Sequence, residues 1–135
     1  MRVLALDHGS ARCGCAISDQ TGTVVTPLEA IERPDTRRGM AAIGALIAER
    51  EVERVVVGLP VHLSGEEGTQ AALARAFVAE LGEVIEVPVD TYDERLTSRM
   101  ADVSRREGAG ASRDSIAAAH LLEAYLMSLA RKGEA

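Results

Sequence analysis

The sequence predicts a mixed α/β fold in which a five-stranded sheet carries helices on both faces. Its first 31 residues hold three strand-like segments joined by short turns, a pattern typical of an antiparallel meander. The rest of the chain alternates helical and strand patterns, which favours parallel strands linked by helical crossovers. With 135 residues, 47% of them hydrophobic, the chain is expected to form a single domain over 1–135 with a substantial core.

The meander is predicted from three short segments. Residues 2–7 (RVLALD) are apolar at odd and even positions alike, as in a strand buried on both faces. Residues 12–18 (RCGCAIS) form the second strand, and the turn residues 19–22 (DQTG) separate it from the third, over 23–31 (TVVTPLEAI). Pro27 in the third segment lacks a backbone N–H, so this strand is expected at an edge of the sheet.

The crossovers are predicted from apolar spacing and capping residues. Asp35 or Thr36 can cap a helix that runs to about Arg50. The later elements, in chain order, are a strand over 54–58, a helix over 67–81 ended by Gly82, a strand over 84–91, a short helix near Ser98, a loop over 107–113 and a helix from Asp114 to Arg131. Helical spacing assigns three core faces: Met40, Ile43 and Ile47; Leu73, Phe77 and Leu81; and Ala118, Leu121, Leu122, Tyr125 and Leu129.

The charge of the chain limits the functions that fit it. A formal net charge of −6 counts against a nucleic-acid partner, because such proteins usually carry a basic surface. Two features offset this: carboxylates can bind metal ions that reverse the local charge, and arginines gather in small clusters such as Arg37–Arg38 and Arg105–Arg106. The chain has neither a membrane-length apolar run nor a signal-peptide pattern, so a cytoplasmic location is expected.

The cysteines and two of the histidines are expected to be structural. Cys13 and Cys15 stand two apart in a predicted strand, where a disulfide fits poorly, and too few further ligands are near for a zinc site. Both are therefore predicted to be buried thiols. His8 is expected to face away from Asp7, and His120 to lie in the core or at its boundary.

Three acidic positions stand at the ends of different predicted elements. Asp7 ends the first strand, Asp93 and Glu94 come straight after the fifth, and Asp114 opens the last helix. Each has an ordinary explanation by itself, as a turn residue, a solvated ion pair or a favourable charge at a helix N-terminus. Together they could converge at one edge of the sheet, where carboxylates would bind Mg²⁺ or Mn²⁺ beside a phosphodiester.

Five segments of the chain resemble a known family. They are LDHGSARCGCAIS (6–18), VVVGLP (55–60), SGEEGTQ (64–70), YDERLTS (92–98) and DSIAAAHLLEAYL (114–126), and they follow the order and spacing of the YqgF/RuvX family. Each segment is a weak signal alone, whereas the five together are specific and cover nearly the whole chain. The resemblance implies an RNase H-like fold, a relation to Holliday-junction resolvases and a link to maturation of the 5′ end of 16S ribosomal RNA.

The resemblance also implies a set of site residues. The catalytic and metal-binding acids would be Asp7, Asp114 and, from the Asp93–Glu94 pair, Glu94, with Mg²⁺ or Mn²⁺ as the cofactor. The residues expected to contact substrate are Gly9, Arg12, His62, Arg95 and Thr97. The chain departs from the family at His62, where relatives often carry Asn, and in the 107–113 loop (EGAGASR), which lacks the lysines common in relatives.

The predicted function is metal-dependent hydrolysis of phosphodiester bonds in nucleic acid. Precursor 16S ribosomal RNA is the expected substrate, and junction DNA is the alternative. A non-catalytic protein bound to nucleic acid or the ribosome stays open, because the chain is acidic. A nucleotide-binding domain of the actin and sugar-kinase type is disfavoured, since such proteins need two lobes and 135 residues supply one. Monomer and homodimer both remain open.

Overall fold

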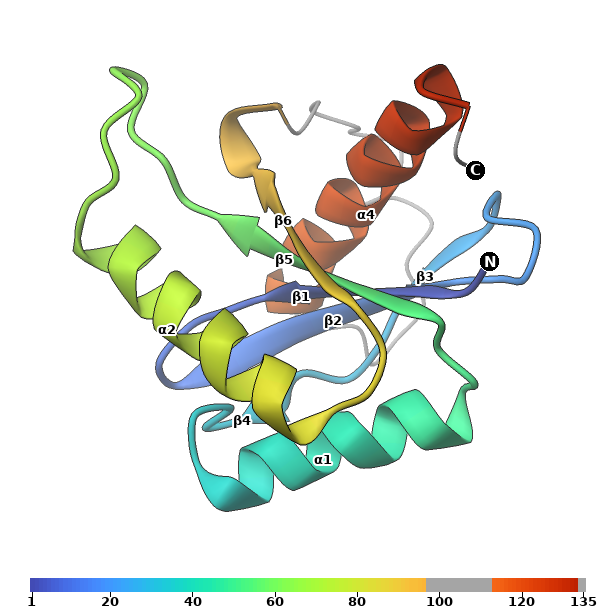
Figure 1. Ribbon diagram of the computed structural model, residues 1–135, viewed down its shortest axis with the longest axis horizontal. Helices are drawn as coiled ribbons and strands as arrows, with labels where there is room; N and C mark the ends of the chain where they lie inside the picture. Colours follow the sequence, from blue (N-terminus) through green and yellow to red (C-terminus); the bar gives the residue numbers. More distant parts are fainter. Residues whose placement is uncertain (97–112, 134–135) are drawn as a thin grey trace.

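The computed structural model describes residues 1–96 and 113–133, with side chains of the last helix described from Ser115 onward. Its centre is a mixed sheet in the order β3-β2-β1-β5-β6 (Figure 1). The strands are β1 (Val3–Asp7), β2 (Arg12–Ser18), β3 (Val25–Pro27), β5 (Arg54–Leu59) and β6 (Val89–Asp93), and a two-residue strand β4 (Ile31–Glu32) also pairs with β2. β1, β2 and β3 pair antiparallel, whereas β5 and β6 run parallel to β1. The predicted fold class is confirmed, with β4 as an additional short strand.

Helices cover both faces of this sheet, as predicted (Figure 1). α1 (Arg37–Glu49) and α2 (Thr69–Val84) pack on the face that carries Leu4 and Leu6, and α4 (Arg113–Arg131) packs on the face that carries Val3 and Ala5. A 3-10 turn, η1 (Glu94–Leu96), follows β6. Because successive residues of a strand point to opposite faces, β1 is apolar at every position up to Asp7.

The predicted third strand, over 23–31, is divided into two short strands on one edge of β2. β3 ends at Pro27 and β4 begins at Ile31. Between them the N–H of Leu28 still donates to the carbonyl of Cys15 at 2.8 Å, but the N–H of Cys15 donates to the hydroxyl of Ser115 in α4 at 3.1 Å. The edge position of Pro27 is confirmed, whereas the uninterrupted strand is wrong because a side chain of α4 takes one position of the ladder.

The boundary between α2 and β6 differs most from the prediction. α2 continues through Gly82 to Val84, and β6 begins only at Val89, so both the helix stop at Gly82 and the strand over 84–91 are wrong. Ile85 is the C-cap: its N–H still donates to the carbonyl of Leu81 at 3.1 Å, and its extended backbone (φ −120°, ψ 158°) ends the helix. The ladder with β5 opens at the carbonyl of Pro88, which accepts from Val55 at 3.0 Å, and Pro88 itself has no N–H to donate.

The predicted core faces are confirmed in α4 and partly wrong in α2. All five predicted residues of α4 are buried against Val3, Ala5 and Val56 of the sheet. In α2 the prediction holds for Phe77 and Leu81, but Leu73 is 44% exposed. The buried face of α2 is completed instead by Ala71 and Ala74, whose small side chains lie against Leu59 at the end of β5. Met40 and Ile43 of α1 are buried, and Ile47 packs at the rim of the same core.

The predictions for the cysteines and for two of the histidines can also be compared with the structure. Cys13 and Cys15 are buried free thiols, as expected. The ring of His8 stacks on Phe77 of α2 at a centroid distance of 4.5 Å, so it faces away from the α4 side, and His120 is half-buried. The helix near Ser98 and the 107–113 loop lie outside the described residues. Among the helices that the structure describes, none is long and apolar enough to cross a membrane.

Candidate active site

The first acidic position lies in the middle of the sheet, on its α4 face. Asp7 shares this face with Val3 and Ala5, and it is half-buried. Its antiparallel partner is Gly14, and the parallel register that joins Leu6 to Val57 continues to Gly58 on the other side. Neither flanking residue has a side chain, so the two neighbouring strands leave room beside Asp7 on this face.

Glu94 occupies part of that room. Gly58 pairs with Tyr92 of β6, and the η1 turn that follows β6 brings Glu94 back over β5. A Cβ atom built on Gly58 would lie 2.7 Å from Oε2 of Glu94 and 3.2 Å from its carboxyl carbon. Gly58 lies two residues after Val56, which faces α4, so this contact is on the α4 face. The carboxylate of Glu94 therefore sits directly over the glycine beside Asp7.

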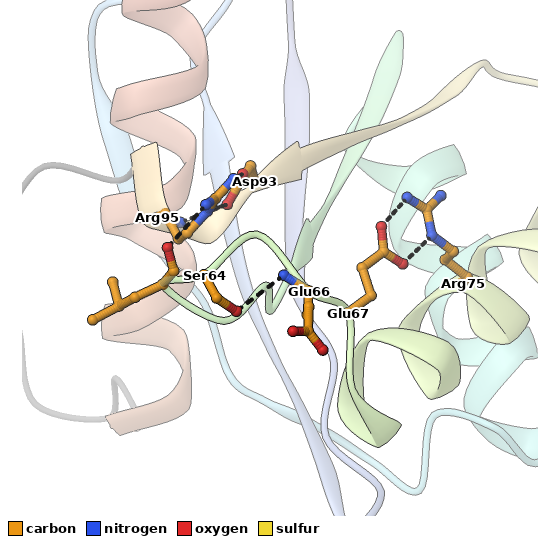
Figure 2. A network of polar contacts seen from close by, with 7 residues as sticks. Ser64, Glu66, Glu67, Arg75, Asp93 and Arg95 are labelled. Atoms are coloured by element: carbon orange, nitrogen blue, oxygen red, sulfur yellow. Dashed lines mark hydrogen bonds and ion pairs between the residues drawn. The ribbon is translucent and has the colours of Figure 1, made fainter.

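The two members of the Asp93–Glu94 pair have opposite environments. Burial, and next the negative charge of Asp93, raise the pKa of Glu94 above its usual value. Asp93 instead accepts from the backbone N–H of Arg95 at 2.9 Å and forms an ion pair with its guanidinium at 2.6 Å, and these contacts lower its pKa (Figure 2). Asp93 is thus neutralised locally by Arg95, whereas no contact among the described residues offsets the charge of Glu94. This difference favours Glu94 as the member directed to the site.

The third acidic position is located by its backbone. Asp114 lies in the first turn of α4, and its side chain is outside the described residues. The next residue, Ser115, is buried and bonded to the N–H of Cys15, which pairs with Leu6, the neighbour of Asp7. The start of α4 is therefore on the same face and at the same end of β1 as Asp7. Among the described side chains, no group of three potential ligands is close enough to hold a metal ion.

The predicted substrate-binding residues surround this end of the sheet unequally. Gly9 makes a tight turn, since a Cβ there would lie 2.7 Å from the carbonyl of Arg12. Arg12 is exposed at the start of β2, on the same face as Gly14. His62 is exposed in the loop after β5, with its ring over Gly68 at the start of α2. Thr97 lies outside the described residues.

Arg95, the fifth of these residues, is engaged within the protein. Its guanidinium is held by Asp93, and its Nη1 donates to the carbonyl of Leu63 at 3.5 Å (Figure 2). It therefore joins the end of β6 to the loop after β5, a connection that the sequence did not predict.

Sequence reasoning also missed the part that Gly58 plays. Gly58 stands inside an apolar strand, not in the turn that follows it. A glycine within a strand often marks a close approach of another group, so a signal was present. The sequence could not identify that group, because Glu94 reaches Gly58 only through the pairing of β5 with β6.

Glu94→Gln should stabilise the metal-free protein at neutral pH. Because the folded state raises the pKa of Glu94 above 4.5, it holds the proton more tightly than the unfolded state does. The contribution of Glu94 to the free energy of unfolding is therefore most favourable at low pH. It falls as pH rises from the pKa of the unfolded state through the higher pKa of the folded state. Removing the charge should therefore raise the melting temperature at pH 7.

This prediction is checked by thermal unfolding in EDTA from about pH 3 to 8. The gain of Glu94→Gln over the unmodified chain should shrink to nothing at the acid end. Glu83→Gln, at an exposed position on α2, serves as the matched control and should change little across the range. A lower melting temperature for Glu94→Gln at pH 7 would mean that the Glu94 carboxylate is stabilised by its surroundings, contrary to the geometry above.

Comparison with known families gives a match over most of the chain. The model of the RuvX family, described as Holliday junction resolvase, matches residues 1–128. A protein of Chloroflexus aggregans assigned as a pre-16S rRNA nuclease is 42% identical over 130 residues, which cover 92% of both chains. A protein of Anaeromyxobacter sp. with the same assignment is 39% identical over 132 residues, covering 93% of this chain and 96% of the relative.

Two solved structures share the fold. RuvC of T. thermophilus, in complex with a Holliday junction substrate, has a TM-score of 0.65 at 16% identity, covering 99% of this chain and 98% of that one. The Fowlpox virus resolvase, in complex with Holliday junction DNA, has a TM-score of 0.54 at 13% identity, covering 96% of this chain and 99% of that one. At such low identity the likeness concerns the fold alone, and it confirms the RNase H-like architecture.

Proposed function

This chain belongs to the RuvX family, and we propose that it is a metal-dependent nuclease that hydrolyses phosphodiester bonds in precursor 16S ribosomal RNA. The observation that carries the proposal is the position of Glu94 over Gly58, beside Asp7 on the α4 face. Two carboxylates on one glycine-lined surface are a good pair of ligands for a cation. Such a substrate implies a cytoplasmic location.

The donors present fit a hard divalent cation. Asp7 and Glu94 offer only carboxylate oxygens, which are the ligands that Mg²⁺ and Mn²⁺ prefer, and Asp114 is proposed as the third acid. The raised pKa of Glu94 means that its charged form is disfavoured in the metal-free protein. A bound cation would favour the charged form and so offset this cost. Bound Mg²⁺ or Mn²⁺ would polarise a phosphoryl oxygen and lower the pKa of the attacking water.

The residues around the acids would bind and orient the phosphodiester chain. Arg12 extends from the start of β2 on the Asp7 face and is proposed to contact a backbone phosphate. The narrow turn at Gly9 lets the chain pass close to this edge of the sheet without a side chain in the way. His62 offers a ring nitrogen near the start of α2. The overall charge of −6 predicts weak binding of nucleic acid, with the arginines and not the acids contacting its backbone.

A DNA junction is the second candidate substrate. The description of the family model as Holliday junction resolvase favours it, whereas the assignments of the full-length relatives favour ribosomal RNA. We place RNA first because those relatives are 39–42% identical over nearly the whole chain.

The proposal is tested by cleavage of three matched substrates: a precursor 16S RNA fragment, a DNA duplex and a four-way DNA junction. The wild-type chain is expected to cut the RNA when Mn²⁺ or Mg²⁺ is present and not in EDTA. Preferential cutting of the junction would select the second candidate. Binding of the RNA without cleavage under every metal condition would replace the nuclease by a non-catalytic binding protein.

A further inference from the structure

We propose that the hairpin over residues 61–67 is a rigid prong whose tip residue, Leu63, contacts an unpaired base of the nucleic-acid substrate. This inference rests on the proposed nuclease function and adds a property of the substrate, namely that it is unpaired near the cut. The hairpin follows Leu59, the last residue of β5, and projects from the body of the protein (Figure 1). Its juxtaposition with Arg95, Asp93 and Arg75 carries the argument.

The hairpin has a defined backbone. Val61 and Glu67 form an antiparallel bridge, and the N–H of His62 donates to the carbonyl of Glu66 at 2.9 Å. The N–H of Gly65 donates back to the carbonyl of His62 at 2.8 Å, and the φ of +95° at Gly65 makes the tight turn possible. Leu63 stands in this turn, so its side chain is presented at the tip.

Both sides of the hairpin are tied to the body by arginines. On one side Glu67 forms two hydrogen bonds of 2.6 Å with Arg75 of α2 (Figure 2). On the other side Arg95, itself held by Asp93, donates to the carbonyl of Leu63. One exposed ion pair contributes little, but a bidentate pair has a fixed geometry, and here one arginine holds the second strand of the hairpin while another contacts its turn. The tip is thus positioned before any substrate binds.

The chemistry of the tip suits a base and not a phosphate. Leu63 is 93% exposed, and residues 61–68 (VHLSGEEG) include no lysine or arginine. Glu66 is exposed on the same hairpin and would repel a phosphate. An apolar side chain can pack on the face of a base only where that base is unstacked, as in a single strand, a bulge or a junction.

The tip also lies within reach of the proposed cut. Leu63 is five residues from Gly58, so even a fully extended chain would place it no more than about 18 Å away. Arg95 also connects the tip to the site, because it donates to the carbonyl of Leu63 and directly follows Glu94 in the chain. The contacted base would therefore be within a few nucleotides of the scissile phosphate.

The test is a binding measurement that does not depend on cleavage. In an Asp7→Asn background, which is expected to bind without cutting, Leu63→Ala should weaken binding of a fluorescein-labelled 12-nucleotide single-stranded RNA about fivefold. Binding of the blunt duplex of the same sequence should change less than about twofold. The slope of log affinity against log salt should be unchanged, because Leu63 releases no counterion.

The matched control is Val84→Ala, which removes another exposed apolar side chain at the far end of α2. It should alter neither affinity. Equal affinities of Leu63→Ala and its parent for the single strand would overturn the inference, as would an equal loss on single strand and duplex. If the Asp7→Asn parent binds neither RNA, the proposed function fails with it, and the two failures are thereby distinguished.

Arg95 should act as a positioning residue through Leu63. Arg95→Lys keeps the charge but loses the forked contact, so it should weaken single-strand binding as Arg95→Ala does. Combined with Leu63→Ala, Arg95→Ala should add little further loss. If Arg95→Lys binds the single strand as well as the parent does, and Arg95→Ala has a smaller slope of log affinity against log salt, Arg95 binds phosphate. It would then not act by positioning Leu63.

Discussion

Asp7→Asn should lower phosphodiester cleavage by at least about a hundredfold while leaving the fold intact. Even residues that only support metal ligands typically cost 10- to 100-fold when changed, so loss of a ligand should exceed that range. The amide keeps the shape of the side chain, and Asp7 stands at the end of a strand whose other residues are buried. Because the exchange is nearly isosteric, the melting temperature should change little.

The measurement compares the wild-type chain with Asp7→Asn from parallel purifications, on the precursor RNA and on junction DNA. Thermal unfolding with and without millimolar Mn²⁺ gives a second readout. Mn²⁺ should raise the melting temperature of the wild-type chain by mass action and have a smaller effect on the variant. Equal cleavage by both proteins would assign the activity to a contaminant or to another part of the chain, and the site proposed here would be wrong.

Gly58→Ala should remove most of the nuclease activity although it adds only one uncharged methyl group. The new Cβ would lie 2.7 Å from Oε2, 3.1 Å from Cγ and 3.2 Å from the carboxyl carbon of Glu94, so the Glu94 side chain must move. Because that side chain is flexible, the cost in stability should be modest, about 1–2 kcal/mol. A displacement of about 1 Å in a catalytic group can cost about a hundredfold in rate, and a loss of 10- to 100-fold is expected.

The control for this substitution is Gly44→Ala in α1, where no described atom beyond the local helix backbone and the chain neighbours lies within 4 Å of the added methyl group. It should stabilise the helix by about 0.5–1 kcal/mol and leave cleavage unchanged. If Gly58→Ala acts by moving Glu94, it should add almost nothing to the loss caused by Glu94→Gln. A fully active Gly58→Ala would show that the position of Glu94 over Gly58 is not needed for the reaction.

The sequence by itself determined the elements whose evidence is local. The continuous apolar run of β1, the edge position of Pro27 and the buried stripe of α4 all follow from local sequence pattern and from the chemistry of single residues. The acids at the ends of elements were visible for the same reason. The motifs of the family then indicated which of these acids to consider together.

The predictions from sequence were wrong where two elements compete for the same residues or for the same hydrogen-bonding position. Residues 84–87 are apolar enough for a strand, yet α2 takes Val84, and Ile85 and Val87 pack against the core without joining the sheet. The third strand is interrupted where Ser115 of α4 bonds to Cys15, a contact between residues 100 positions apart. Local patterns contain no information about such a competitor.

Only the tertiary structure decided how the acids differ from one another. Asp93 and Glu94 are adjacent and chemically alike, but Asp93 forms an ion pair with Arg95, whereas the η1 turn places Glu94 over Gly58. The space beside Asp7 likewise depends on the register of β1 with β2 and β5, which sets Gly14 and Gly58 on either side of it. The direction of a side chain within one strand is a local property, so the sequence contains it. The identity of the residue across the ladder is set by long-range pairing, so it emerges only when the sheet is assembled.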